Sequence, residues 1–420
     1  MPTLFQINVV ANWGSTGRIA EEIGQMAIKC GWKSYIAYGR GKPKSQSKLI
    51  RIGNKVDMYR HALISRLLDN HGLNSNKATR KLIDRIRDIK PDIVHLHNIH
   101  GYFLNYALLF DFLKDAGIPI VWTLHDCWTF TGHCAHFIFI GCDKWKVGCK
   151  HCPQKLSYPT SWLCDRSHRN YKIKKMVYTS IPNLILVPVS DWLAGLLRFS
   201  FMKEYSIRRI YNGVDLMTFS PQGNTLQLRR RIGVIQRYML IGVASVWSAR
   251  KGLADFVALR RKLSIQEYAM VLIGLTQKQI QELPQGIVGI SRTNSVKELA
   301  EYYSVANVFV NPTWEDNFPT TNLEALACDT PVITYQTGGS IEAIDEKTGI
   351  IVPTGDVEIL TQSVRQICED RIIEEGQCRK RVIELYNISN KRNSNDKNTG
   401  RGSRSEERRV GKECRSRWSP

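Results

Sequence analysis

The feature that most constrains the fold is an alternation of short apolar runs with longer segments of helical periodicity. In the first half of the chain, runs rich in Val, Ile and Leu occupy 4–10, 33–38, 92–97, 118–125 and 184–189, and helical segments such as 18–29 and 104–116 separate them. This alternation is typical of βαβ units, in which helices join parallel strands. Because the runs are apolar throughout, we expect strands buried on both faces and predict a doubly wound α/β fold.

The same pattern restarts after residue 225. Apolar runs occupy 239–246, 269–275, 286–290, 307–310, 331–334 and 349–352, with helical segments at 251–263 and 296–303. Between the two series, 211–226 contains Asn-Gly, Ser-Pro and Gly-Asn pairs that favour turns. We therefore predict two Rossmann-like domains, 1–210 and 227–386, joined by a linker at 211–226 and facing each other across a cleft. The polar, aperiodic stretch 387–420 is interpreted as a disordered or artefactual tail.

Charge and hydropathy bear on location and partners. The formal net charge is +21, with basic clusters in 80–90 and 168–175. Two interpretations stay open: solvated helix faces, or contact with an anionic bilayer. No spacing typical of nucleic-acid-binding modules accompanies the charge, so we expect no nucleic-acid partner. No run reaches the ~18 apolar residues of a membrane span, and no basic region precedes the first run. We expect a cytoplasmic protein, with peripheral attachment to the inner face of the plasma membrane as a further option.

The segment 311–344 carries the most specific motif. An acidic loop, Glu315–Asp316–Asn317, follows a predicted strand; Phe318 and Pro319 come next, and a helix is predicted from Thr320. The unpaired N–H groups at a helix start suit a diphosphate or sugar hydroxyls. Carboxylates at Asp316 and Glu324 suit vicinal hydroxyls. The alternative is a capping box formed by Thr321 and Glu324, which would make Glu324 structural.

Other candidate residues lie at the ends of predicted strands. Gly14 and Gly17 follow the first run and allow backbone to approach a phosphate, although such a turn is also common without a ligand. Arg250 and Lys251 could neutralise a diphosphate, or could begin an ordinary basic helix. His97 and His125 each end a run, where a buried histidine is often structural. Arg18 could meet an anionic acceptor or be solvated.

The chain has 11 cysteines, and without a secretion signal we expect no disulfide framework. Four of them, Cys134, Cys142, Cys149 and Cys152, fall in an insert at 127–153 that has little periodicity. Four thiols could bind a structural zinc ion, although the spacing lacks the second C-x2-C pair of a standard ribbon. The alternative is a set of reduced core cysteines.

Several segments together resemble the family 4 retaining glycosyltransferases, which have the GT-B fold. The segment 311–344 is similar to their donor-binding signature, 210–221 (IYNGVDLMTFSP) to their interdomain segment, and 189–193 (VSDWL) to the strand end before it. The likeness extends over 3–385 and points to the bacterial surface-polysaccharide transferases of the colanic-acid type. It implies a hexosyltransferase that moves a sugar from a nucleotide-diphosphate sugar to a glycan or polyprenyl-linked acceptor, and that needs no cofactor for catalysis.

The resemblance also implies residue roles. Glu324 would hold the ribose, and Asp316, with its loop neighbours from Glu315 to Thr320, would contact the donor sugar. Lys251, with Arg250, would clamp the diphosphate, and His125 would position the donor sugar. Gly14 and Gly17 would face donor phosphates and acceptor; His97 and Arg18 are the expected acceptor contacts.

Two positions depart from the family pattern: Asp316 replaces the usual Glu, and Val246 stands where the family has Arg. These departures keep two alternatives open. One is a sugar-nucleotide-binding protein without transfer activity, and the other is a different GT-B enzyme such as an epimerase.

Overall fold

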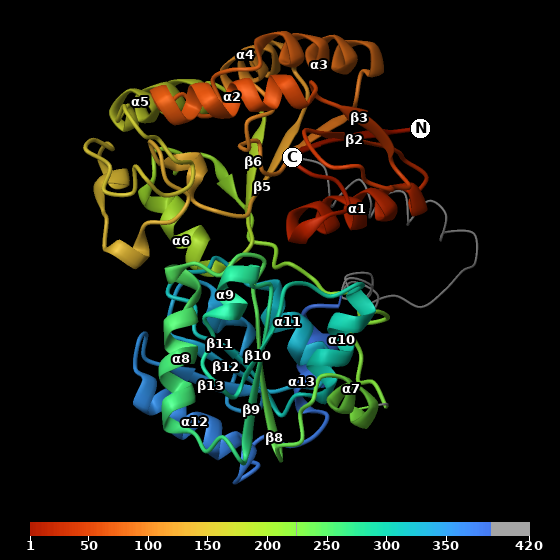
Figure 1. The fold of residues 1–420 in the computed structure, drawn as a ribbon. Helices are drawn as coiled ribbons and strands as arrows, with labels where there is room; N and C mark the ends of the chain where they lie inside the picture. Colours follow the sequence, from red (N-terminus) through yellow and green to blue (C-terminus); the bar gives the residue numbers. More distant parts are fainter. Residues whose placement is uncertain (224, 388–420) are drawn as a thin grey trace, which may run out of the picture. The chain divides into compact units, whose positions relative to one another are not determined.

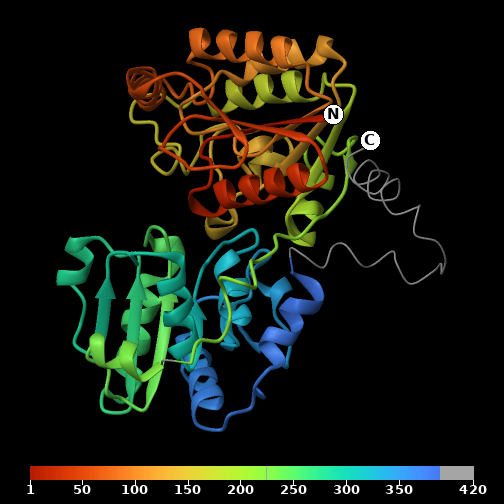
Figure 2. The ribbon, with the colours of Figure 1, turned by 90° about the vertical axis from the view of Figure 1, so that its right-hand side faces the viewer.

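The computed structural model describes residues 1–223 and 225–387. They form two compact units, Met1–Ile210 and a second that begins at Tyr211 (Figures 1 and 2). The predicted tail lies outside the described residues except for Asn387, whose backbone pairs with Val214. In the part of the chain that is described, no helix is long and apolar enough to cross a membrane.

Unit 1 is built on a seven-stranded parallel sheet in the order β3-β2-β1-β4-β5-β6-β7. Its strands are β1 (Thr3–Asn8), β2 (Lys33–Tyr38), β3 (Lys48–Arg51), β4 (Ile93–Leu96), β5 (Ile120–Leu124), β6 (Leu184–Pro188) and β7 (Ser206–Ile207). Its helices are α1 (Gly14–Lys29), α2 (Lys55–Leu68), α3 (Asn76–Ile89), α4 (Tyr106–Ala116), α5 (Ser167–Tyr178) and α6 (Asp191–Phe199). Side-chain caps fix several helix starts; for example, the Asn105 amide oxygen accepts from Ala107 N and Leu108 N before α4.

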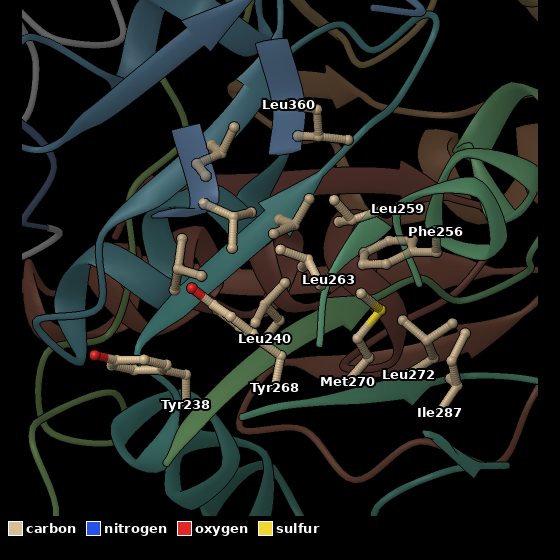
Figure 3. Packing of buried hydrophobic residues seen from close by; sticks show 14 of the residues in the cluster. Tyr238, Leu240, Phe256, Leu259, Leu263, Tyr268, Met270, Leu272, Ile287 and Leu360 are labelled. Atoms are coloured by element: carbon tan, nitrogen blue, oxygen red, sulfur yellow. The ribbon is translucent and has the colours of Figure 1, made fainter. Parts of the chain in front are cut away.

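Unit 2 is built on a six-stranded parallel sheet in the order β10-β9-β8-β11-β12-β13. Its strands are β8 (Tyr238–Val243), β9 (Tyr268–Ile273), β10 (Ile287–Ile290), β11 (Val308–Asn311), β12 (Val332–Tyr335) and β13 (Gly349–Val352). Its helices are α7 (Thr225–Arg231), α8 (Leu253–Lys262), α9 (Gln277–Gln281), α10 (Val296–Val305), α11 (Thr320–Ala327), α12 (Val357–Cys368) and α13 (Gln377–Leu385). Figure 3 shows the core between sheet and helices, where Leu240, Phe256 and Leu272 are fully buried.

Both sheets share one topology, and this topology locates the sites. Starting from β1 and β8, the chain first winds towards one edge of the sheet and then returns to the other side of the first strand. The direction reverses between β1 and β4 in unit 1, and between β8 and β11 in unit 2. Loops at the carboxyl ends of these pairs diverge, which opens a crevice where doubly wound folds bind ligands.

The stretch between β5 and α5 departs from regular structure. It contains only three 3-10 turns among its ordered elements, η1 (Trp128–Phe130), η2 (Ile138–Ile140) and η3 (Lys144–Lys146). Phe130, Phe137 and Trp145 pack against one another with ring centroids 5.0 to 6.2 Å apart. The predicted cysteine-rich insert falls within this stretch, which continues to Ser167.

Candidate functional site

In unit 2, the predicted donor residues gather at the β8/β11 reversal. The loop after β8 includes a 3-10 turn, η4 (Ala249–Lys251). Trp314 N donates to Arg250 O at 2.8 Å, and the Arg250 guanidinium donates to the Glu315 carbonyl. The Lys251 ammonium forms an ion pair with the Asp316 carboxylate. Backbone and side-chain bonds therefore hold the two loops together.

Glycines allow this close approach. Gly252 has φ +73°, and a Cβ there would lie 2.1 Å from Pro312 O. Gly338, after β12, has φ +52°, and its Cβ would lie 2.0 Å from Asp316 O. Gly339 N donates to the same carbonyl at 3.0 Å. The loops after β8 and β12 thus both pack against the backbone of the segment 312–316, and no larger residue fits at these two contacts.

Glu324 is held inside unit 2, and not by a helix cap. Helix α11 begins at Thr320 as predicted, but its N-cap is Pro319, with no side-chain capping bond. The capping-box alternative is therefore wrong. The Glu324 side chain is buried and accepts a hydrogen bond from the Tyr303 hydroxyl at 3.2 Å. Sequence reasoning missed Tyr303, because nothing in α10 distinguishes it from a core tyrosine.

The remaining residues of the loop between β11 and α11 pack inside unit 2 and are largely shielded from solvent. Asn317, Phe318 and Pro319 are buried, and Thr320 is half-buried. The Phe318 ring stacks on Tyr211 with centroids 4.9 Å apart. This packing fixes the direction in which the N-terminus of α11 points, since the loop cannot move without disturbing the core. Val246, where the family pattern departs, is 68% exposed in the loop after β8.

In unit 1, the turn after β1 places its glycines as the sequence predicted. Gly14 is the first residue of α1 and has φ +62°. Gly17 is buried, and a Cβ there would lie 3.1 Å from the Val10 side chain. Arg18 is partly exposed on the same helix. Trp13 is the N-cap residue of α1, makes no side-chain capping bond and is 66% exposed.

His97 and His125 form one hydrogen-bonded chain at the carboxyl ends of β4 and β5. His97 Nε2 lies 3.0 Å from Gln6 Oε1, and His97 Nδ1 lies 3.3 Å from His125 Nε2. The Gln6 amide nitrogen donates to Ala20 O, so its oxygen must be the acceptor from His97. A neutral His97 then accepts at Nδ1 from His125 Nε2–H, which leaves the lone pair of His125 on Nδ1.

Burial keeps both rings neutral. Desolvation lowers the pKa of His97 well below its usual value, assisted by His95 and His125. Desolvation also lowers the pKa of His125 to about 4, with Asp126 opposing the shift. His97 is 1% exposed, and both its ring nitrogens have partners. That placement leaves almost no His97 surface for the expected acceptor contact, and the hydrogen bond orients the His125 ring.

A second polar chain lies beside His125. His100 Nε2 is 2.7 Å from the Asp126 carboxylate, and His100 Nδ1 is 2.8 Å from the Tyr158 hydroxyl. Burial alone would raise the pKa of Asp126, but His100 and the Trp128 N–H outweigh it and lower the pKa. These two hydrogen bonds connect Tyr158, in the irregular stretch, to Asp126, the residue that follows His125.

The four cysteines of the predicted zinc site line one small cavity. Among the described residues, however, no group of three or more His, Cys, Asp or Glu side chains is arranged so that it could hold a metal ion as it stands. The basic cluster at 168–175 is also not uniformly solvated, because Lys174 is 1% exposed.

Comparisons with known proteins agree for both units. Residues 16–217 match Glycosyltransferase Family 4, and residues 236–370 match Glycosyl transferases group 1. The colanic acid biosynthesis glycosyl transferase WcaC of Escherichia coli K12 is 24% identical over 380 residues, covering 86% of this chain and 89% of that protein.

Solved structures give the same fold. Sucrose-phosphate synthase of Thermosynechococcus elongatus has a TM-score of 0.68 at 18% identity, covering 93% of this chain and 97% of its own. Anabaena HepE, solved with UDP-glucose, has a TM-score of 0.63 at 12% identity, covering 99% of each chain. The predicted architecture of two parallel-sheet α/β domains of the GT-B type is confirmed. The chain belongs to the family 4 glycosyltransferases.

Proposed function

We propose that this protein is a retaining glycosyltransferase that transfers a sugar from a nucleotide-diphosphate sugar to a glycan or polyprenyl-linked acceptor in bacterial surface-polysaccharide biosynthesis. The observation that carries the proposal is the β8/β11 reversal of unit 2, where a lysine–aspartate ion pair and a buried glutamate adjoin one helix start. WcaC, similar over most of the chain, supports the biosynthetic context.

The nucleotide-sugar donor would bind to these groups of unit 2. Glu324 accepts hydrogen bonds from the ribose hydroxyls, while the diphosphate meets the N-terminus of α11 and the Lys251 ammonium. Since Lys251 is paired with Asp316, an arriving diphosphate competes for the ammonium and frees the carboxylate to accept from donor-sugar hydroxyls. HepE has been solved with UDP-glucose, which favours a nucleoside diphosphate here.

The chemical step breaks the bond between the anomeric carbon and the diphosphate. Lys251 and Arg250 stabilise the negative charge that develops on the leaving diphosphate, the largest contribution a protein makes to such a reaction. The acceptor hydroxyl attacks from the same face, and a phosphate oxygen of the donor takes its proton, so the anomeric configuration is retained. His125, neutral and oriented by His97, contacts the donor sugar and positions it.

Thermal unfolding of the full chain with UDP, GDP or ADP tests the donor site. We expect one nucleotide to raise the Tm, and Glu324→Ala to abolish the rise. Product analysis then decides the reaction: incubation with the matching nucleotide sugar should release the nucleotide and a sugar of unchanged anomeric configuration. A new nucleotide sugar would indicate an epimerase. Binding without release in the presence of bacterial membrane lipids would indicate a binding protein.

For the membrane, we propose that α2 and α3 of unit 1 form a docking surface. A groove of about 850 Å³ runs between β3 and α3, and its lining includes Lys48, Arg51, Lys77, Lys81 and Arg85. Beside it, α2 exposes Val56, Tyr59 and Leu63, which are 52–74% exposed and lie on one helical face. Cations beside an exposed apolar stripe suit the boundary of an anionic bilayer.

Co-sedimentation with vesicles tests this surface. Binding should require anionic lipid, and each cation contributes ~1 kcal/mol near such a surface. The double variant Lys81→Ala, Arg85→Ala should therefore weaken binding roughly 30-fold. The matched control is Lys203→Ala, Lys278→Ala, which removes two exposed cations elsewhere. Equal loss in both double variants would show that only net charge matters and would contradict the assignment.

A further inference from the structure

We propose that Cys134, Cys142, Cys149 and Cys152 bind one structural zinc ion that fixes the irregular stretch after β5. This inference is independent of the proposed reaction, because its readout is metal content. The four thiols come from a 19-residue segment, and all four line the same cavity, together with Phe137 and Trp145. That cavity measures about 10 Å³, roughly the room that one water molecule needs.

The groups that surround the four sulfur atoms favour thiolates. Gly132 N donates to Cys149 Sγ at 3.2 Å. The Trp145 indole lines the cavity, and its Nε1 is buried without a hydrogen-bond partner. A thiolate is an acceptor for such an N–H group, whereas a neutral thiol accepts only weakly. The two N–H groups would donate hydrogen bonds to the thiolates, as groups around a zinc–thiolate centre do.

A buried cation adds to this. Lys174 donates to Trp128 O at 2.5 Å and Thr131 O at 3.0 Å, and lies 3.4 Å from the centroid of the Trp128 ring. Thr131 is adjacent to Gly132, the donor to Cys149. An ammonium that is 1% exposed is costly without opposite charge. The Asp126 and Asp69 carboxylates already favour the charged form of Lys174, and zinc with four thiolates, which carries a charge of 2−, would add to them.

The metal-free arrangement is not a finished chelate. The Cys134 and Cys152 thiols are hydrogen bonded to each other, and with the side chains as they stand no group of three or more His, Cys, Asp or Glu among the described residues could hold a metal ion. Zinc binding therefore needs side-chain rotations that turn the four thiols towards one point in the cavity that they line. Each thiol releases its proton to solvent as its sulfur binds zinc.

The consequence reaches the candidate site. The stretch begins directly after His125, and Asp126 is linked through His100 to Tyr158. The backbone hydrogen bonds within this stretch are mostly those of short turns, such as Gly141 N to Ile138 O and Gly148 N to Lys144 O. A zinc ion would join turns that these local bonds leave separate.

The test is metal analysis of the full chain purified in reducing buffer and then equilibrated with zinc, with excess removed. We expect about one zinc per chain, and a thiolate-to-metal charge-transfer band when Co²⁺ replaces zinc. Cys142→Ser should lose the bound metal and the cobalt band. Cys164→Ser is the matched control, because Cys164 is partly exposed in the same stretch but does not line the cavity.

Chelator addition provides a second readout. The Tm of the wild-type chain should fall on removal of zinc, and that of a folded Cys142→Ser variant should not change. The proposal is overturned if the folded wild-type chain binds no zinc and gives no cobalt band, or if Cys142→Ser keeps a full equivalent. Loss of zinc in Cys164→Ser as well would also contradict it.

Discussion

Replacing Glu324 by Gln removes a charge from the proposed ribose contact while keeping the shape of the side chain. Glu324 is buried, with 3% of its surface exposed, so a hydroxyl that it binds is shielded from water. A hydrogen bond to a charged group contributes ~1.5–3 kcal/mol, which corresponds to roughly 10- to 150-fold in affinity. We expect a loss of that size for whichever nucleoside diphosphate the wild type binds.

Isothermal titration calorimetry of folded wild type and variant measures this directly. The glutamine oxygen can still accept from the Tyr303 hydroxyl, so the unliganded Tm should change little. Tyr303→Phe is the matched control: it removes the 3.2 Å bond to Glu324 but leaves the carboxylate. That variant should lose ~1–3 kcal/mol of unfolding free energy and less affinity than Glu324→Gln.

Affinity within twofold of wild type in a folded Glu324→Gln variant would refute the reasoning. It would mean that the carboxylate stabilises unit 2 through Tyr303 and does not contact the ligand. Equal affinity losses in Glu324→Gln and Tyr303→Phe would instead indicate that the hydrogen bond between the two residues, and not the charge of Glu324, supports nucleotide binding.

Three further predictions concern the other parts of the site. Lys251→Met should lower kcat about 10²–10³-fold, as expected when a group that stabilises developing charge is removed, and steady-state release of nucleotide measures it; an unchanged kcat would contradict that role. His97→Phe should lower kcat with little change in donor KM, because it frees the ring of His125 from its hydrogen bond without touching the donor; an effect on KM alone would contradict positioning. Stability should fall below pH 6.5, because burial lowers the folded pKa of His61 and His95 to about 3 and of His125 to about 4, so the unfolded chain takes up protons that the folded chain does not. The loss should be ~1.4 kcal/mol per pH unit for each histidine down to about pH 4, and urea unfolding between pH 7.5 and 5 that gave constant stability would contradict it.

The central strands were predictable because they are buried on both faces. The run 184–189 covers β6, and 307–310 overlaps β11, whose four residues are all buried. The edge strands β3 and β7 were missed. β3 reads KLIR and is exposed at both ends, and β7 has two residues. An edge strand pairs on one side only, so its sequence need not be apolar, and the periodicity that reveals a buried strand is absent.

The site divides in the same way. Residues whose position follows from strand ends, such as Lys251 and His125, could be named from sequence. The partners of these residues could not, since Tyr303 reaches Glu324 from a different helix and Gly338 meets Asp316 from a third loop. Their sequence separations of 21 and 22 residues carry no periodic signal. The capping-box reading failed for a related reason: spacing alone does not state at which residue a helix begins.

The pairing of Lys251 with Asp316 explains how one departure from the family pattern can be tolerated. Val246 supplies no positive charge to a diphosphate, so the burden falls on Lys251 and Arg250. One N–H group of the Arg250 guanidinium donates to the Glu315 carbonyl and supports the acidic loop, so Arg250 adds its charge from a fixed position. Lys251, 21% exposed and paired with a side chain, can exchange partners without breaking the backbone of the loop. An aspartate at 316, shorter than the usual glutamate, keeps its carboxylate close to its own backbone, where it can hold the ammonium until a diphosphate replaces it.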